Sequence, residues 1–350
     1  MAWRKRQNCS INALPRPRVS AKAGPSTYNV ARAPGSWRAP ATASDFFHRE
    51  ERVTARSGWL STPSLRFHYL RWGSEGSPVV LLHGLASTCR IWELTAPSLA
   101  SACRVWAPDQ RGHGLTDKPT EGYDFPTVVE DLRSFLAGLG IERPLLVGHS
   151  WGAGVALHYA ATWPQETAGL VLVDGGTMDP SAWSTDRAEA RRRLTPPDLT
   201  HLTPEELRRR VTRRLAESGI RRPGAVEAVM ACFREGPDGR VRPRLPREQH
   251  MQVVDALLDH RPSELYPRVR CPVLLVPARW PQREGDPRGL RAKETGVARA
   301  LALLPAARAV WLDRTVHDVP LQRPDRLAEL ILEHAERVFG APDSAPGGPA

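Results

Sequence analysis

Apolar runs of strand length alternate with longer, helix-like segments along most of the chain beyond residue 53. Most of these runs are unbroken instead of alternating with polar residues, as strands buried on both faces require. Alternation of such strands with helices predicts a mostly parallel sheet with helices on both sides. The runs span residues 78–82, 104–108, 144–148, 169–173, 272–276 and 309–312, and two shorter β-like runs precede them at 53–57 and 65–72.

Helical spacing is clearest in two segments. Apolar residues recur three and four positions apart over 128–139, and the pattern stops at Gly140, a residue that commonly ends a helix. A second amphipathic helix is predicted over 325–339. The Pro- and Gly-rich residues 341–350 that follow it are expected to form a flexible tail.

The alternation of strands and helices is interrupted once, between Val173 and Pro272, where almost a hundred residues contain helix candidates but no convincing strand. One candidate helix starts at Thr203, with Glu206 in the capping-box position, and another covers 247–258. An insertion of this size in an α/β core is expected to lie over one face as a separate layer. The sequence therefore predicts a helical cap.

The net charge of +11 is concentrated at the N-terminus. Residues 1–44 hold eight basic residues and no acidic ones, which leaves about +3 for the rest of the chain. This segment has no repeat or helical period that would direct it to nucleic acid or to a membrane. We expect residues 1–50 to be a disordered basic tail, with a transit peptide or an over-long start as the alternatives.

Other composition features point to an ordinary cytoplasmic protein. No stretch of 18 uninterrupted apolar residues predicts a membrane span, and the N-terminus lacks the apolar middle of a secretory signal. The five cysteines are widely spread, without a CxxC pair or a Cys/His cluster of metal-binding spacing. No nucleotide-binding loop is present, so we expect no metal and no cofactor, and no pattern predicts an oligomeric state.

The strongest chemical signal is Gly148-His149-Ser150-Trp151-Gly152, a G-x-S-x-G that directly follows an apolar run and directly precedes a helix rich in small residues. Glycines on both sides allow strand and helix to approach closely while the serine hydroxyl stands clear on a strained turn. The adjoining helix N-terminus has unpaired N–H groups where an oxyanion would develop. Ser150 is therefore the predicted nucleophile, and a Gly/Ser turn without chemistry is the alternative.

A serine nucleophile needs a base. Of the eleven histidines, His317 is selected by its position in the predicted fold. It follows the last predicted core strand, and the carboxyl ends of parallel strands open on one common edge. Ser150 and His317 would thus meet despite their separation in sequence. His149 is expected to point away from the neighbouring serine, and His158 lies deep in a helix, so both are interpreted as structural.

These features together resemble the α/β-hydrolase fold family over roughly residues 53–338. The resemblance rests on His83-Gly84 after the third strand, the segment 109–114 (DQRGHG) after the fourth, the 148–152 turn and the late His317. It implies an eight-stranded, mostly parallel sheet flanked by helices, with a cap inserted after strand six. The core would then comprise 51–177 and 271–340, and the cap 178–270.

The same resemblance implies site residues that the pattern alone does not supply. The oxyanion hole would use the backbone amides of Leu85, which follows His-Gly, and Trp151, which follows the nucleophile. Asp109, Arg111 and His113 match a family motif that is normally structural. We therefore assign these three residues no chemistry.

The acid of the triad departs from the commoner family pattern, because the segment after the seventh strand has no carboxylate at the usual position. Some members, including haloalkane dehalogenases, carry the acid at the end of strand six, where this chain has Asp174 followed by Gly175 and Gly176. Asp174 would orient the imidazole and stabilise its protonated form. Asp286 and Glu284 in the later loop are the alternatives, as is a site without a working acid.

Serine at the nucleophile position argues against the sister classes that use aspartate there, the epoxide hydrolases and haloalkane dehalogenases. The predicted reaction is hydrolysis of an ester, thioester or amide of a small molecule through an acyl-enzyme, with esters most favoured. The ring of Trp151 would either line the substrate pocket or pack in the core. A non-catalytic protein of the same fold that binds a small ligand or partner is the main alternative, and an acyltransferase or C–C hydrolase is another.

Overall fold

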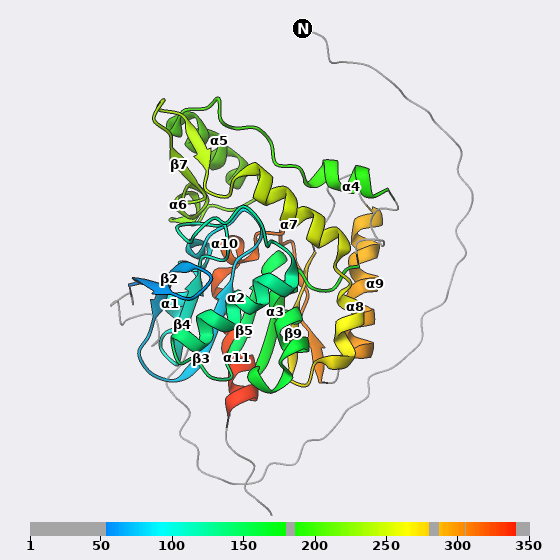
Figure 1. Ribbon diagram of the computed structural model, residues 1–350. Helices are drawn as coiled ribbons and strands as arrows, with labels where there is room; N and C mark the ends of the chain where they lie inside the picture. The colour runs from blue at the N-terminus through cyan, green and yellow to red at the C-terminus, as the bar shows by residue number, and fades with distance from the viewer. Residues whose placement is uncertain (1–53, 180–185, 280–286, 305, 341–350) are drawn as a thin grey trace, which may run out of the picture. The chain divides into compact units, whose positions relative to one another are not determined.

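The computed structural model of the chain describes residues 54–179, 186–279, 287–304 and 306–340, all within the compact unit Glu51–Ala350 (Figure 1). The tails predicted over 1–50 and 341–350 lie outside the described residues. None of the helices in the described ranges is long and apolar enough to cross a membrane.

Eight strands form one sheet. In chain order they are β1 (Arg56–Ser61), β2 (Arg66–Trp72), β3 (Ser77–Leu82), β4 (Cys103–Pro108), β5 (Leu145–His149), β6 (Gly169–Val173), β9 (Val273–Val276) and β11 (Ala307–Ala309). Their order across the sheet is β1-β2-β4-β3-β5-β6-β9-β11. The pairs β1–β2 and β2–β4 are antiparallel and all the others are parallel. The predicted eight-stranded, mostly parallel sheet is confirmed.

Successive side chains of the central strands enter two separate hydrophobic clusters. In β3, Val79 and Leu81 belong to one cluster and Val80 and Leu82 to the other, and all four are fully buried. Because neighbouring side chains of a strand point to opposite faces, a strand covered on both faces must be apolar throughout. This double burial explains the unbroken apolar runs of the sequence.

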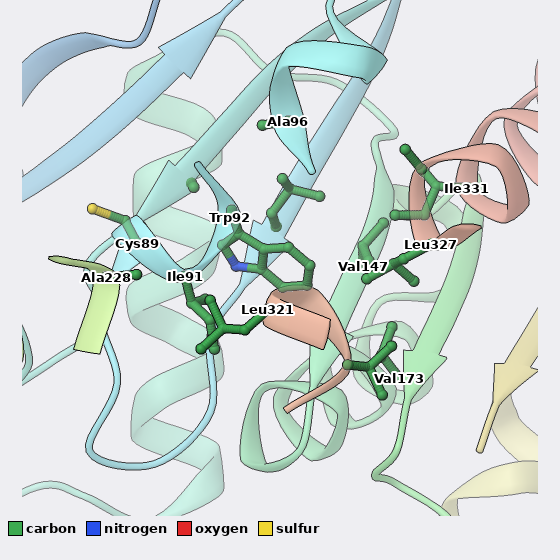
Figure 2. Packing of buried hydrophobic residues seen from close by; sticks show 14 of the residues in the cluster. Cys89, Ile91, Trp92, Ala96, Val147, Val173, Ala228, Leu321, Leu327 and Ile331 are labelled. Carbon is green, nitrogen blue, oxygen red and sulfur yellow. The ribbon is translucent and has the colours of Figure 1, made fainter. Parts of the chain in front are cut away.

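Helices cover both faces of the sheet. The first cluster takes residues from α1 (Ala96–Leu99), α10 (Val319–Gln322) and α11 (Pro324–Phe339), together with the 3-10 segment η2 (Cys89–Trp92). Figure 2 shows part of it, with strand residues Val147 and Val173 in the same cluster as Leu327 and Ile331 of α11. The second cluster takes residues from α2 (Phe125–Gly138), α3 (Trp151–Thr162) and α9 (Pro287–Leu303). A short 3-10 segment, η3 (Pro164–Glu166), follows α3.

The two helices predicted from spacing are present as α2 and α11. Helix α2 begins three residues before the first apolar position of the predicted segment. Its N-cap is Asp124, whose carboxylate accepts a hydrogen bond from the Thr127 N–H at 2.9 Å. Such a cap satisfies an N–H group that the first helical turn leaves without a partner.

Two strands differ from their prediction by more than one residue at an end. Strand β1 begins at Arg56, not at residue 53, and continues to Ser61. The last run is divided between β11 and a short strand β12 (Leu312–Asp313), which pairs with β10 (Ala278–Arg279). Pro277 stands between β9 and β10 and has no N–H to contribute to the ladder, so the pairing is interrupted there.

The insertion between β6 and β9 contains the helices that the sequence predicted and one feature that it did not. Thr203 and Glu206 form the expected capping box at the start of α5. A two-stranded hairpin around the turn Pro237-Asp238-Gly239 is the difference, since no strand was expected here. Its strands have only three residues each, too short for a visible alternation. The elements are α4 (Arg187–Leu194), α5 (Pro204–Glu217), α6 (Ala225–Met230), β7 (Phe233–Glu235), β8 (Val241–Pro243), α7 (Arg247–Asp259), α8 (Pro262–Leu265) and η5 (Tyr266–Arg268).

Candidate active site

Three polar residues meet where parallel strands end. Ser150 directly follows β5, Asp174 directly follows β6, and His317 lies four residues after β12. The carboxyl ends of neighbouring parallel strands lie at one edge of a sheet. The fold thus brings together side chains that are up to 167 positions apart.

The turn at Ser150 has a backbone conformation that non-glycine residues rarely adopt. Its φ is 55° and its ψ is −117°, and α3 begins at the next residue. Glycine is required at both flanking positions because other backbone atoms approach them closely. A Cβ on Gly148 would collide with the carbonyl oxygen of Gly152, and a Cβ on Gly152 would collide with that of Leu82. Packing on both sides therefore holds the strained serine in place.

His317 lies between the serine and the aspartate. The distance from its Nε2 to Ser150 Oγ is 2.8 Å, and that from its Nδ1 to Asp174 Oδ2 is 2.7 Å. One tautomer satisfies both contacts, with Nδ1–H donating to the carboxylate and Nε2 accepting from the hydroxyl. The His317 side chain is 55% exposed, whereas that of Asp174 is 2% exposed.

Asp174 is buried, but its carboxylate has three partners. Besides His317, Oδ1 accepts hydrogen bonds from the Ala278 N–H at 2.9 Å and from Lys293 Nζ at 2.8 Å. Burial by itself would raise the pKa of Asp174, but the hydrogen bond and charge of His317 and the charge of Lys293 outweigh it. The pKa of Asp174 is held well below its usual range, so the group is a carboxylate at neutral pH.

The alternative acids, Glu284 and Asp286, lie outside the described residues. Lys293 was missed by the sequence analysis, because a lysine in the middle of an amphipathic helix carries no motif. Only the packing of α9 places its ammonium against a carboxylate 119 positions earlier.

The charge of Asp174 also affects His317. Desolvation lowers the pKa of the imidazole, but the hydrogen bond to Asp174 and the negative charges of Asp174 and Asp318 raise it by more. The net pKa of His317 is raised from its ordinary value of 6.5. An imidazole with such a pKa accepts a proton readily near neutral pH, as general-base chemistry requires.

His149 was expected to have a structural role, and the structure shows a specific contact that it makes with the main chain of His317. Its Nε2 donates to the backbone carbonyl of His317 at 2.8 Å, with the two ring centroids 4.9 Å apart. Burial and the nearby His317 lower the pKa of His149 to about 4. The ring is therefore neutral at ordinary pH and holds the main chain of the residue that contacts the serine.

The backbone amides of Leu85 and Trp151 are the predicted donors for a developing oxyanion. Leu85 lies in a tight turn closed by the Ser87 N–H and the Gly84 carbonyl, and Trp151 is the first residue of α3. Within the described ranges, neither Leu85 nor Trp151 donates its backbone N–H to a protein acceptor. Both groups are free to bind an oxygen atom, as an oxyanion hole requires.

The motif after β4 supports this turn. His113 accepts the Ala86 N–H on Nε2 at 3.1 Å, next to the predicted oxyanion donor Leu85. Asp109 accepts from two backbone N–H groups and contacts His68, and Arg111 pairs with Asp131. All these contacts are internal ones that shape loops.

The ring of Trp151 is 2% exposed and stacks on His113, with centroids 5.2 Å apart and planes at 24°. Of the two alternatives that the sequence left open, this position favours packing in the core over lining a substrate pocket. The proposed place of Trp151 in the site rests on its backbone amide instead.

Apolar residues of the insertion contact the turn that carries Leu85. The Leu85 side chain packs against a small cluster of Ala190 from α4 and Val254 and Leu258 from α7. Two ion pairs join these helices, Arg187 with Asp259 at 2.5 Å and Arg191 with Asp255 at 2.8 Å. These contacts attach α4 and α7 of the insertion to the turn that carries Leu85.

One group of potential metal ligands occurs among the described residues. His68, Cys89 and Asp109 place one ligand atom each within 4.8 Å of one another, and all three are buried. The Asp109 oxygens are already bonded to backbone N–H groups and to His68. Burial and the charge of Asp109 raise the pKa of the Cys89 thiol well above its ordinary value, which disfavours the thiolate that metals bind. These contacts fit a structural cluster.

Comparison with known proteins gives a match over most of the chain. A model of the alpha/beta hydrolase family matches residues 79–330. The crystal structure of E-2-(acetamidomethylene)succinate hydrolase superposes with a TM-score of 0.66 at 22% identity, covering 80% of this chain and 98% of that one. A thioesterase domain from the curacin biosynthetic pathway gives a TM-score of 0.62 at 21% identity, covering 80% and 99%.

Curated sequence relatives match over shorter segments. A soluble epoxide hydrolase from Corynebacterium sp. (strain C12) is 41% identical over 95 residues, 27% of this chain and 33% of that protein. A haloalkane dehalogenase from Mesorhizobium japonicum is 36% identical over 106 residues, 30% of this chain and 34% of that protein. The chain thus spans about a third of the length of these relatives.

Proposed function

Because the chain belongs to the alpha/beta hydrolase family, we propose that it is a serine hydrolase that cleaves an ester, thioester or amide of a small molecule. Ser150 acts as nucleophile, His317 as general base and Asp174 as the acid that orients it. The observation that carries the proposal is the continuous line of hydrogen bonds from Asp174 Oδ2 through both ring nitrogens of His317 to Ser150 Oγ.

In the first half of the reaction, Ser150 Oγ attacks the substrate carbonyl carbon while its proton passes to His317 Nε2. The negative charge moves to the carbonyl oxygen, which the N–H groups of Leu85 and Trp151 stabilise. The imidazolium then gives its proton to the leaving alcohol, thiol or amine as the tetrahedral intermediate breaks down. An acyl ester of Ser150 remains.

In the second half, water takes the place of the leaving group. His317 removes a proton from the water as it attacks the acyl carbon, and the same proton returns to Ser150 Oγ when the ester bond breaks. Asp174 stays ionised throughout and stabilises the imidazolium at each stage. The products are a carboxylic acid and the free enzyme.

The surroundings of Leu85 support a substrate with an apolar portion. The partly buried side chain of Leu85 packs with Leu194 of α4 and Met251 of α7 in one apolar cluster next to the turn that follows Gly84. Burial of an apolar group contributes roughly 25 cal/mol for each Å² removed from water. We therefore expect p-nitrophenyl butyrate to be a better substrate than p-nitrophenyl acetate.

The test combines labelling with turnover. The purified chain is treated with a fluorophosphonate probe, and hydrolysis of p-nitrophenyl butyrate is followed in parallel. We expect stoichiometric labelling at Ser150 and loss of both signals in Ser150→Ala and in His317→Ala. Ser101→Ala, which changes an exposed serine on the loop before β4, is the matched control and should behave as the wild type.

Three other results would contradict the proposal. A folded chain that is neither labelled nor active would be a ligand- or partner-binding member of the family. A chain that is labelled but turns over no ester, thioester or amide would also be a ligand- or partner-binding member of the family. Transfer of the acyl group to an added alcohol in preference to water would indicate an acyltransferase.

A further inference from the structure

The second oxygen of the Asp174 carboxylate is held by a positive charge from a helix outside the proposed triad. Lys293 lies in α9, and its Nζ is 2.8 Å from Asp174 Oδ1 and 3.0 Å from the Ala278 carbonyl oxygen. Its side chain is 23% exposed, so the ion pair with Asp174 is largely shielded from solvent. Shielded pairs interact more strongly than exposed ones.

We propose that Lys293 is a positioning residue of this site: its ammonium fixes the orientation of the Asp174 carboxylate and limits the negative charge that reaches His317. This inference rests on the proposed triad and adds to it a fourth residue that contacts neither the serine nor the imidazole.

The geometry supports the orienting role. The Ala278 N–H and the Lys293 ammonium both bind Oδ1, which leaves Oδ2 directed at His317 Nδ1. Without the ammonium, Oδ1 would keep a single neutral donor. A carboxylate with fewer bonds can rotate about its last torsion, which is soft, and the hydrogen bond to the imidazole would then be less well aligned.

The charges around His317 define the electrostatic role. Asp174 after β6 and Asp318 in the same loop as His317 favour the imidazolium, whereas Lys293 from α9 and the nearby His149, if protonated, oppose it. His149 is neutral above its pKa of about 4. Among the described residues, Lys293 is the cation whose charge lowers the pKa of His317 near neutral pH, and it thereby keeps more of the base in its neutral form.

The decisive variant is Lys293→Met, which keeps much of the side-chain volume and removes the charge. The pH at which His317 titrates is measured by NMR of the imidazole Cε1–H, assigned by comparison with His317→Gln. We expect the midpoint to move to higher pH by roughly 0.5 to 1 unit, because the charge of Asp174 is no longer offset. Lys293→Arg should keep the midpoint close to that of the wild type.

Two further variants distinguish this role from the simpler one in which the ion pair only holds α9 in place. Arg299→Met removes a cation of the same helix from another carboxylate, Asp179, at 2.8 Å, and should leave the His317 midpoint unchanged. Lys293→Gln keeps a donor but no charge, so its midpoint should move with that of Lys293→Met, and it serves in its place if the methionine variant does not fold.

Kinetics with p-nitrophenyl butyrate give a second readout. In Lys293→Met, the acidic limb of the kcat/KM profile should move upward with the NMR midpoint, and kcat at its plateau should fall about 3- to 10-fold with little change in KM. An unchanged His317 midpoint in both Lys293→Met and Lys293→Gln would overturn the inference. The titration needs no turnover, so an inactive wild type would contradict the proposed function and leave this test intact.

Discussion

At the scale of single residues, Asp174 makes contacts that a turn former or helix cap would not need. Its backbone has a φ of 44°, a conformation that is costly for a residue with a Cβ, and its side chain is buried with three hydrogen-bonding partners. Asp174 was one of three candidates at the level of sequence. The contact with His317 supports it, and its role as the acid of the site remains a prediction.

Asp174→Asn should therefore reduce ester turnover by about 10⁴-fold with the fold intact, as loss of such a carboxylate does in a serine-histidine-aspartate site. The amide cannot stabilise the imidazolium and favours the wrong tautomer of His317. Measurement of kcat for p-nitrophenyl butyrate checks this, with circular dichroism as the test of folding. Asp286→Asn is the matched control, and a comparable loss in that variant alone would move the acid to Asp286.

A second prediction at this scale concerns His149. His149→Phe keeps an aromatic ring beside His317 but loses the donor to its carbonyl, whereas a glutamine can place an amide N–H near the position of Nε2. We expect kcat to fall roughly 10-fold in His149→Phe and to recover in part in His149→Gln, since an imidazole that is held less firmly transfers protons less efficiently. Equal activity of the two variants would show that the donor has no part in placing the base.

At the scale of elements, the site depends on how closely β5, α3 and the loop after β3 approach one another. The Gly152 position faces the carbonyl oxygens of Leu82 and His83, and the Gly148 position faces the backbone of the helix. Sequence predicted this strand–turn–helix unit, because a G-x-S-x-G between an apolar run and a small-residue helix is a local pattern. The β7–β8 hairpin was not predicted, because three-residue strands carry too little pattern.

Gly152→Ala tests the close approach. An added methyl group would meet backbone atoms that cannot rotate away, so we expect a loss of about 3 kcal/mol or more in the free energy of unfolding. Gly140→Ala is the control, because its Cβ would meet nothing within 4 Å and its only cost is a positive φ of 62°. That variant should cost roughly 1 to 2 kcal/mol from backbone strain alone. Urea unfolding monitored by fluorescence compares the two, and equal losses would mean that packing at Gly152 is not tight.

At the scale of the whole molecule, several histidines in the described ranges are buried so deeply that desolvation outweighs the groups that favour their protonation. Burial lowers the pKa of His260 to about 3 and that of His334 to about 4. In the unfolded chain these groups bind protons below about 6.5. As the pH falls from 6.5, the unfolded state therefore takes up protons that the folded state does not, and stability decreases.

We expect the free energy of unfolding to decline steadily between pH 6.5 and 4, with each such histidine contributing up to about 1.4 kcal/mol per pH unit. His260 stacks on Phe125 with ring centroids 3.9 Å apart, and His260→Leu should make the decline shallower. Urea unfolding at half-unit pH steps measures the slope. His201→Gln, at an exposed position, should leave it unchanged, and identical slopes for wild type and His260→Leu would contradict the prediction.

Sequence alone determined the parts of this protein that depend on local pattern. Burial on two faces requires an unbroken apolar run, and a strained turn between strand and helix requires glycines at fixed spacing. From these patterns the sequence predicted the class of the sheet and placed Ser150 and His317 at the carboxyl ends of its strands. Only the tertiary structure decided which groups from distant parts of the chain lie around Ser150 and His317. Asp174 and Lys293 lie 143 and 24 positions from His317, and neighbours in space at such separations follow from strand order and helix packing, which no local pattern encodes.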